Sequence, residues 1–161
     1  MNLLVKSIAV LSAVFLLSAC DTNPSGTATD NGAGMNNFSN NGSMGSLDAE
    51  GKVGDRVFFE LDSSQLDNEA QATLSKQAEW LKSNANVKLT VEGHCDERGT
   101  REYNIALGER RATAVKKFLV GLGIPSNRIS TISYGKERPA IIGSDDASWS
   151  QNRRAVSVAT N

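Results

Sequence analysis

An arginine inside an otherwise apolar helix stripe is the feature that most limits how this chain can fold. Within residues 90–115, an alternating strand pattern gives way to a polar loop and then to a helical pattern. The residues that recur at the spacing of one helix face are Leu107, Arg111, Val115, Phe118 and Leu122. This spacing turns the Arg111 guanidinium toward the core, where a cation needs an anionic partner.

Asp96 lies in the loop before this helix, and two interpretations of its relation to Arg111 stay open on spacing alone. In the first, the two residues form a plain salt bridge that ties the loop to the helix. In the second, the carboxylate accepts an ammonium while the guanidinium holds a carboxylate bidentately. The second arrangement would be a receptor for the zwitterionic head of an amino acid.

The first twenty residues are typical of an export signal rather than of the folded domain. Lys6 supplies the positive start, and residues 8–17 form an apolar run too short to span a membrane. The sequence LSAC at positions 17–20 resembles the lipobox of bacterial lipoproteins, which implies a signal peptide over residues 1–19 and lipidation of Cys20. Three acyl chains would anchor the mature chain stably to a membrane. The alternative is an ordinary cleavage site with an incidental cysteine.

Cleavage at this position would remove Lys6, one of 17 basic residues, and would leave 16 basic against 18 acidic residues. A slightly acidic chain has no electrostatic footprint for nucleic acid, so nucleic acid is not an expected partner. If Cys20 carries lipid, Cys95 is the only remaining thiol and cannot form an internal disulfide. The core must therefore hold without a covalent cross-link.

The mature chain divides into a tether and one folded domain. Residues 20–51 are rich in Gly, Asn and Ser and predict a flexible tether, and residues 52–161 predict the domain. Strand patterns occur at residues 56–61, 87–92, 129–134 and 155–159, and helix patterns occur at 68–83 and 103–122. This order predicts an α/β fold, an α+β sandwich in which the helices pack on a mixed four-stranded sheet. The stretch between 135 and 153 is expected to be a loop.

Several motifs together indicate a family. They are GHCDERGT, YNIALGERRA, ISYGKERPA and NRRAV, and the spaced residues Asp96, Leu107, Gly108, Arg111, Ala112 and Val115. Over about residues 53–159 the chain resembles the OmpA-like peptidoglycan-binding domain. The resemblance implies a βαβαββ unit that binds the diaminopimelate side chain of the peptidoglycan stem peptide, without catalysis.

The same resemblance assigns roles to individual residues. It implies that Asp96 accepts the ammonium of diaminopimelate and that Arg111 holds its carboxylate. It also implies help from the end of the first strand and from the loop and helix start, at Leu61, Asp62, Arg98, Thr100 and Asn104. In the lipid-anchored branch of the family, it further implies a link between the outer membrane and the cell wall, with TolB and other Tol proteins as partners in cell division.

Two alternatives within this reading stay open. Asp21, directly after Cys20, resembles a signal that retains lipoproteins in the inner membrane, although we favour the periplasmic face of the outer membrane. The chain could also be an OmpA-like wall-binding lipoprotein that works outside the Tol system.

His94 and Cys95 raise a different class of function. A metal site would need His94, Cys95 and neighbouring acids from one short loop, whereas zinc usually takes ligands from separated segments. A nucleophile and base on adjacent residues would diverge, and nothing supplies an oxyanion hole. We therefore predict no metal, no cofactor and no catalysis, with His94 packed in the loop and Cys95 semi-buried. A redox or metal sensor based on Cys95 is the alternative.

The remaining charged and aromatic residues are expected to be structural or solvated. Asp96 and Glu97 should both be ionised because of their Arg-rich surroundings. Arg153 and Arg154 should be solvated, and Trp80 and Trp149 should be packing residues. Arg110, Lys116 and Lys117 should form a solvated helix face.

Overall fold

The computed structural model describes residues 53–160. The predicted signal peptide, Cys20, Asp21 and the tether at residues 20–51 lie outside the described residues. The elements in chain order are β1 (Arg56–Phe58), α1 (Asn68–Ser83), β2 (Lys88–His94), α2 (Arg101–Gly121), a 3₁₀ turn (Ser126–Arg128), β3 (Ile129–Gly135), α3 (Asp146–Asn152) and β4 (Arg154–Thr160).

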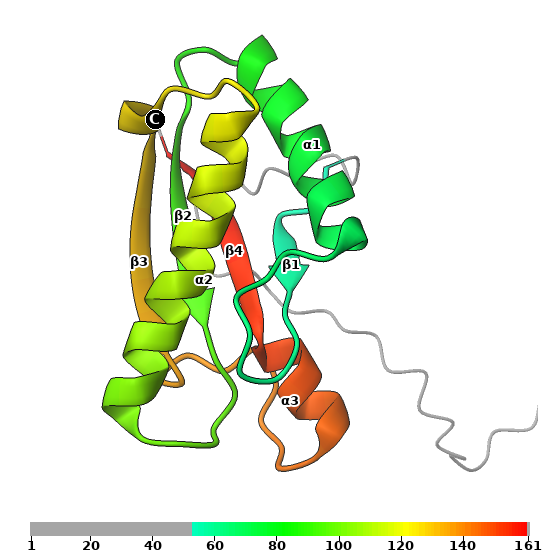
Figure 1. Ribbon diagram of the computed structural model, residues 1–161, viewed down its shortest axis with the longest axis vertical. Helices are drawn as coiled ribbons and strands as arrows, with labels where there is room; N and C mark the ends of the chain where they lie inside the picture. The colour runs from blue at the N-terminus through cyan, green and yellow to red at the C-terminus, as the bar shows by residue number, and fades with distance from the viewer. Residues whose placement is uncertain (1–52, 161) are drawn as a thin grey trace, which may run out of the picture. The chain divides into compact units, whose positions relative to one another are not determined.

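The strands form one mixed sheet in the order β1-β4-β2-β3. β2 and β3 are parallel and are joined through α2, because a parallel pair needs a crossover connection. β4 lies antiparallel between β1 and β2. Helices α1 and α2 lie side by side on one face of this sheet (Figure 1). The predicted fold of helices on a mixed four-stranded sheet is confirmed.

Most element boundaries lie within two residues of the sequence patterns, and three of the differences bear on the site. β1 ends at Phe58 rather than at residue 61, so Leu61 and Asp62 lie in a turn beyond the strand. β2 extends two residues past its predicted end, to His94. The predicted loop before β4 contains α3, a seven-residue helix that begins after Asp145, whose carboxylate accepts a hydrogen bond from the Ser148 backbone N–H. Seven residues are too few for apolar periodicity to show a helix.

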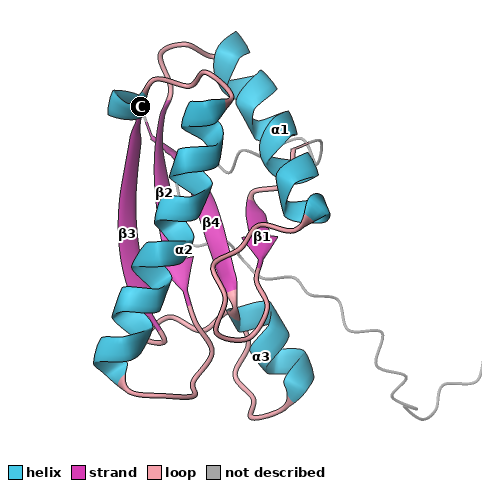
Figure 2. Cartoon of the chain, in the orientation of Figure 1, coloured by secondary structure: helices cyan, strands magenta, loops and turns pink. Residues whose placement is uncertain are grey.

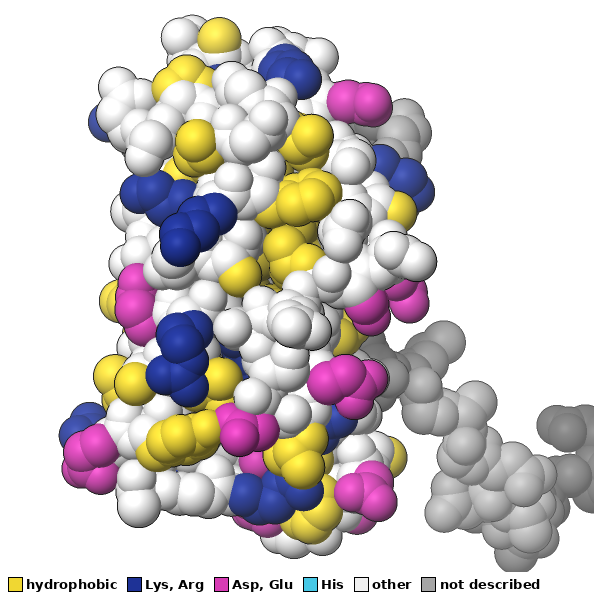
Figure 3. Space-filling model, viewed as in Figure 1, with side chains coloured by type: hydrophobic (Ala, Val, Ile, Leu, Met, Phe, Trp, Pro, Cys, Tyr) yellow, Lys and Arg dark blue, Asp and Glu magenta, His cyan; other side chains and the backbone are white. Residues whose placement is uncertain are grey.

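The core fills the space between the sheet and the two long helices. Its fully buried side chains include Leu74, Leu81, Leu89, Val91, Val115 and Leu119. Figure 3 shows hydrophobic surface between α1 and α2. Trp80 of α1 and Phe118 of α2 are partly buried and pack against the core. The predicted packing role of Trp80 is confirmed. Among residues 53–160, none of the helices combines the length and apolar character that a membrane span requires.

A pair of glycines lets α2 lie unusually close to β2. A Cβ atom at Gly93 would collide with the backbone carbonyl of Gly108, and a Cβ at Gly108 would collide with the Ser133 side chain. This contact sets the carboxyl end of β2 against the first half of α2. The turn after β1 and helix α3 lie at the same end of the sheet (Figure 2).

Candidate functional site

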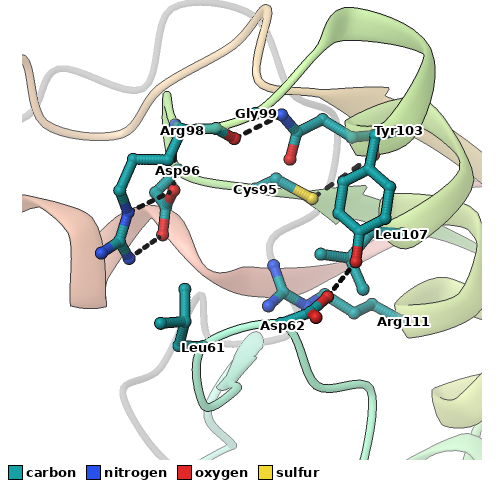
Figure 4. Close-up of a pocket in the computed structure, with 10 residues that line it drawn as sticks. Leu61, Asp62, Cys95, Asp96, Arg98, Gly99, Tyr103, Leu107 and Arg111 are labelled. Carbon is teal, nitrogen blue, oxygen red and sulfur yellow. Dashed lines mark hydrogen bonds and ion pairs between the residues drawn. The ribbon is translucent and has the colours of Figure 1, made fainter.

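An open pocket of about 230 Å³ lies at this end of the sheet (Figure 4). Its lining residues come from the turn after β1, the loop after β2 and the first half of α2: Leu61, Asp62, Cys95, Asp96, Arg98, Gly99, Tyr103, Asn104, Leu107 and Arg111. Six of the seven binding residues predicted from the sequence line this pocket, and Thr100 does not. The turn after β1 therefore meets the loop after β2 and the start of α2, which lie far from it in the sequence.

Arg111 lies at the inner side of the pocket and is fully buried. Its partners are backbone carbonyls: Nε donates to Ser63 (2.8 Å), and the terminal nitrogens donate to His94 (2.8 Å) and Glu60 (3.1 Å). Three carbonyl dipoles are thus the partners of this cation within the described part of the chain, and the plain Asp96–Arg111 salt bridge, the first of the two interpretations, does not form. Burial lowers the pKa of Arg111. These bonds use three of its five N–H donors, and the Cys95 side chain also lies within hydrogen-bonding reach of the guanidinium.

Two of the three carbonyls that bind Arg111, those of Glu60 and Ser63, belong to the turn between β1 and α1. In this turn Asp62 has a φ of 54°, and it is the only described residue other than glycine with a positive φ. Its carboxylate accepts a hydrogen bond from the Tyr103 hydroxyl, 41 residues later in the chain. Arg111 and Tyr103 thus fix the turn against α2, and backbone strain of this kind concentrates at functional sites.

Asp96 is 5% exposed and forms the opposite wall of the pocket. Its Oδ1 accepts hydrogen bonds from Arg98 Nε and the Arg98 backbone N–H, both at 3.1 Å, and its Oδ2 accepts one from Arg98 at 2.6 Å. A terminal nitrogen of Arg153 lies 3.6 Å from Oδ2. Burial alone would raise the pKa of Asp96, but the hydrogen bonds and charge of Arg98, helped by Arg153, lower it. The predicted ionised state of Asp96 is confirmed.

Arg153 and Arg154 are not solvated, so that prediction was wrong. The Arg153 side chain is 14% exposed, and its Nε donates to the Phe59 carbonyl at 2.9 Å. Arg154 is buried, which lowers its pKa to about 10. Helix α3 ends just before these two residues, and the turn into β4 brings Arg153 toward the pocket. The sequence pattern did not show α3 and therefore could not place them.

Trp149 in α3 contacts Arg98, one of the residues that line the pocket. The Arg98 guanidinium carbon lies 4.1 Å from the centre of its ring, and its Nε1 donates to the Glu97 carboxylate at 3.1 Å. Hydrogen bonds from Ser144 and Trp149 lower the pKa of Glu97. Glu97 is thus ionised, as predicted. Trp149, like Trp80, has a packing role.

Thr100 and Asn104 shape the loop that carries Asp96. The Thr100 hydroxyl accepts a hydrogen bond from the Tyr103 backbone N–H and caps α2. The buried Asn104 amide donates to the backbone carbonyls of Arg98 (2.7 Å) and Thr100 (3.0 Å). Gly99, between Arg98 and Thr100, has a φ of 86°, a backbone conformation that favours glycine. Thr100 therefore positions the site without lining it.

His94 and Cys95 are both more buried than the sequence predicted. His94 is the last residue of β2 rather than part of the loop, and burial lowers its pKa. Its Nε2 lies 3.6 Å from the Glu92 carboxylate. The Cys95 thiol donates to the Asn104 carbonyl at 3.4 Å, and burial raises its pKa. Within residues 53–160, no cluster of three or more His, Cys, Asp or Glu side chains is placed to hold a metal ion.

Tyr103 and Leu107 line the pocket but were not predicted as site residues. The signal was present, because Tyr103, Leu107 and Arg111 are spaced four residues apart and share one helix face. Gly99 gave no such signal.

Comparison with known proteins identifies the family. Residues 58–153 match the OmpA family. The peptidoglycan-associated lipoprotein of Brucella melitensis is 60% identical over 106 residues, which are 66% of this chain and 63% of that protein. The chain thus spans less than two thirds of that relative. The peptidoglycan-associated lipoprotein of Haemophilus influenzae is 42% identical over 156 residues, 97% of this chain and 98% of that protein.

A solved structure agrees with these sequence relatives. The crystal structure of the peptidoglycan-associated lipoprotein from Burkholderia pseudomallei superposes with a TM-score of 0.65 at 43% identity, and it covers 66% of this chain and 91% of that one. The family predicted from the motifs is confirmed: the chain belongs to the OmpA family, and the three relatives named here are peptidoglycan-associated lipoproteins.

Proposed function

We propose that this chain binds peptidoglycan non-covalently by holding the zwitterionic end of the diaminopimelate side chain in the pocket at the end of β2. The observation that supports this most is the pairing of opposite charges across the pocket. A buried guanidinium, whose bonds to carbonyls use only three of its five N–H donors, lies on one side, and an ionised carboxylate lies on the other. The relatives' name, peptidoglycan-associated lipoprotein, agrees with this ligand.

Arg111 is the group that would hold the ligand's carboxylate. Because its side chain is already fixed by three carbonyls, it loses little conformational freedom when a ligand binds. Charge-assisted hydrogen bonds from a guanidinium are also stronger in a desolvated site than in water. Leu61 and Leu107 offer apolar contact to the methylene groups of the same side chain.

Asp96 would accept the ligand's ammonium, and Asp62 adds a second carboxylate to the pocket. Nothing in this arrangement activates a nucleophile. The Cys95 thiol is buried and held in its protonated form, which argues against a reactive thiol and against a Cys95-based sensor. The function that fits the site is binding without a catalytic step.

At the level of the whole chain, lipidated Cys20 would anchor the protein to the periplasmic face of the outer membrane. Residues 20–51 would give the domain reach toward the wall. The similarity to the Haemophilus influenzae lipoprotein supports the anchor, because it extends over 97% of this chain. Membrane fractionation tests this assignment, since recovery in the inner membrane would favour the sorting signal suggested by Asp21.

A role within the Tol system, with TolB and other Tol proteins as partners, completes the proposal. The alternative is a wall-binding lipoprotein outside that system. Co-purification of TolB with the full-length chain from membranes would support the first, and its absence alongside intact wall binding would support the second. Cys95→Ser should leave wall binding unchanged.

Sedimentation with purified cell walls tests wall binding. The full-length chain in detergent should sediment with diaminopimelate-containing walls and remain in solution with lysine-type walls. Asp96→Asn should lose this binding, whereas the matched control Glu97→Gln should retain it, because Glu97 binds Trp149 outside the pocket lining. Equal sedimentation of both variants with both wall types would contradict the proposal.

A further inference from the structure

Arg98 already occupies the carboxylate that the ligand's ammonium would need. The Arg98 guanidinium donates to both oxygens of Asp96, at 3.1 and 2.6 Å, and the Arg98 backbone N–H adds a third hydrogen bond at 3.1 Å (Figure 4). A carboxylate offers about four acceptor sites. Oδ1 therefore has both of its sites filled, and Oδ2 has one site left.

The remaining site on Asp96 also faces a cation. The Arg153 terminal nitrogen lies 3.6 Å from Oδ2, so two guanidinium groups already surround this single carboxylate. A ligand ammonium would be a third cation beside one negative charge, and like charges at this distance repel. An ammonium can therefore bind Asp96 well only if one of the two arginines leaves.

Arg98 is the one that can leave. The Arg153 side chain is 14% exposed and also donates to the Phe59 carbonyl, which holds it in place. The Arg98 side chain is 36% exposed, and apart from Asp96 its guanidinium contacts the face of the Trp149 ring. This stacking, and the nearby negative charge of Asp146, can keep the guanidinium at the mouth of the pocket after it releases Asp96.

We propose that Arg98 competes with the ligand's ammonium for Asp96, so that it weakens wall binding and sets how much the ammonium contributes to recognition. This inference rests on the proposed function. It changes the role of Arg98, because the family resemblance implies a residue that helps binding. A ligand whose amine is acylated carries no ammonium and therefore does not compete with Arg98 for Asp96.

The test is calorimetric titration of the full-length chain in detergent with two muramyl tripeptides. One ends in diaminopimelate with a free side-chain amine, and the other carries the same amine acetylated. The variants are Arg98→Gln, Arg98→Lys and the matched control Arg101→Gln, whose arginine lies three residues away and binds Glu137 instead. Arg98→Gln keeps the backbone hydrogen bond to Asp96, and Arg153 stays beside the carboxylate, so the fold should be preserved.

Arg98→Gln should bind the free-amine peptide about fivefold more tightly, which is about 1 kcal/mol at 1.4 kcal/mol per factor of ten. Arg98→Lys should show a smaller gain, because it loses the bidentate contact but keeps the charge. Affinity for the acetylated peptide should not change, and Arg101→Gln should match the wild type with both. If Arg98→Gln binds the free-amine peptide and the wild type shows no binding, the competition is even stronger than this.

Weaker or unchanged binding of the free-amine peptide by folded Arg98→Gln would overturn the competition while leaving the proposed function intact. An equal gain for both peptides would also overturn it, because the effect would then not involve the ammonium. If neither the wild type nor Arg98→Gln binds either peptide, the proposed function and this inference both fail.

Discussion

Helix α2 turns one face toward the sheet along its whole length, but its two halves place different residues there. The second half contributes Val115 and Leu119, which are fully buried in the aliphatic core. The first half contributes Asn104 and Arg111, which are equally buried but make hydrogen bonds to backbone carbonyls. The site is thus built by placing polar groups in a stripe that otherwise forms core, where backbone carbonyls of neighbouring segments accept their hydrogen bonds.

The largest effect is expected from Arg111→Leu, which makes the first half of α2 resemble the second. It leaves the carbonyls of Glu60, Ser63 and His94 without their donor. The free energy of unfolding should fall by about 3–5 kcal/mol, since each unsatisfied buried group costs about 1–3 kcal/mol. Urea denaturation measures this loss. Arg110→Leu is the control, because Arg110 is exposed, and an equal loss in both variants would contradict the role of the carbonyls.

Leu119→Ala tests the second half of the same face. The side chain is fully buried, so its truncation should lower the free energy of unfolding by about 2–4 kcal/mol. The folded variant should still bind the diaminopimelate peptide with unchanged affinity, because Leu119 lies outside the pocket lining. Val120→Ala, at an exposed neighbouring position, should have little effect on stability. Loss of peptide binding by folded Leu119→Ala would show that the two halves are not separable.

A smaller effect, a pH dependence of the free energy of unfolding, is expected from His94 at the edge of the site. Burial lowers its pKa in the folded state, so the unfolded chain binds this proton more readily. The contribution to stability is full above the unfolded pKa of about 6.5 and is lost as the pH falls from there toward the folded pKa. His94 is the only histidine. Denaturation at pH 5 and 7.5 should therefore show lower stability at pH 5, and His94→Gln should remove most of the difference. A persistent difference would assign it to other groups.

The smallest effect is expected from Tyr103→Phe. This variant loses the hydrogen bond between α2 and Asp62 but keeps the ring that lines the pocket. Because the contact is exposed, stability should hardly change, while affinity for the diaminopimelate peptide should fall about two- to fivefold as the turn loosens. Tyr134→Phe is the matched control outside the pocket, and an equal fall in both variants would argue against this role.

The sequence patterns predicted most of the fold because the long helices and strands carry clear periodicity. α1 spans Asn68–Ser83 as expected, whereas α3 is too short to show a period. The inward position of Arg111 was also predicted from spacing. Its partners could not be, since two of the three carbonyls that bind it come from a turn 48 and 51 residues earlier in the chain. Arg153 follows α3 directly and lies beside Asp96, so the sequence pattern that missed this helix also missed the second cation near Asp96.

The most direct test of the zwitterion receptor compares two ligands that differ in one group. The full-length chain in detergent is titrated calorimetrically with a muramyl tripeptide that ends in diaminopimelate and with its lysine counterpart, which lacks the side-chain carboxylate. Without that carboxylate, the charge-assisted hydrogen bonds from Arg111 cannot form, a loss of about 1.5–3 kcal/mol. The account predicts binding of the diaminopimelate peptide at least about tenfold more tightly. Equal affinity for the two peptides, with the chain folded, would contradict it.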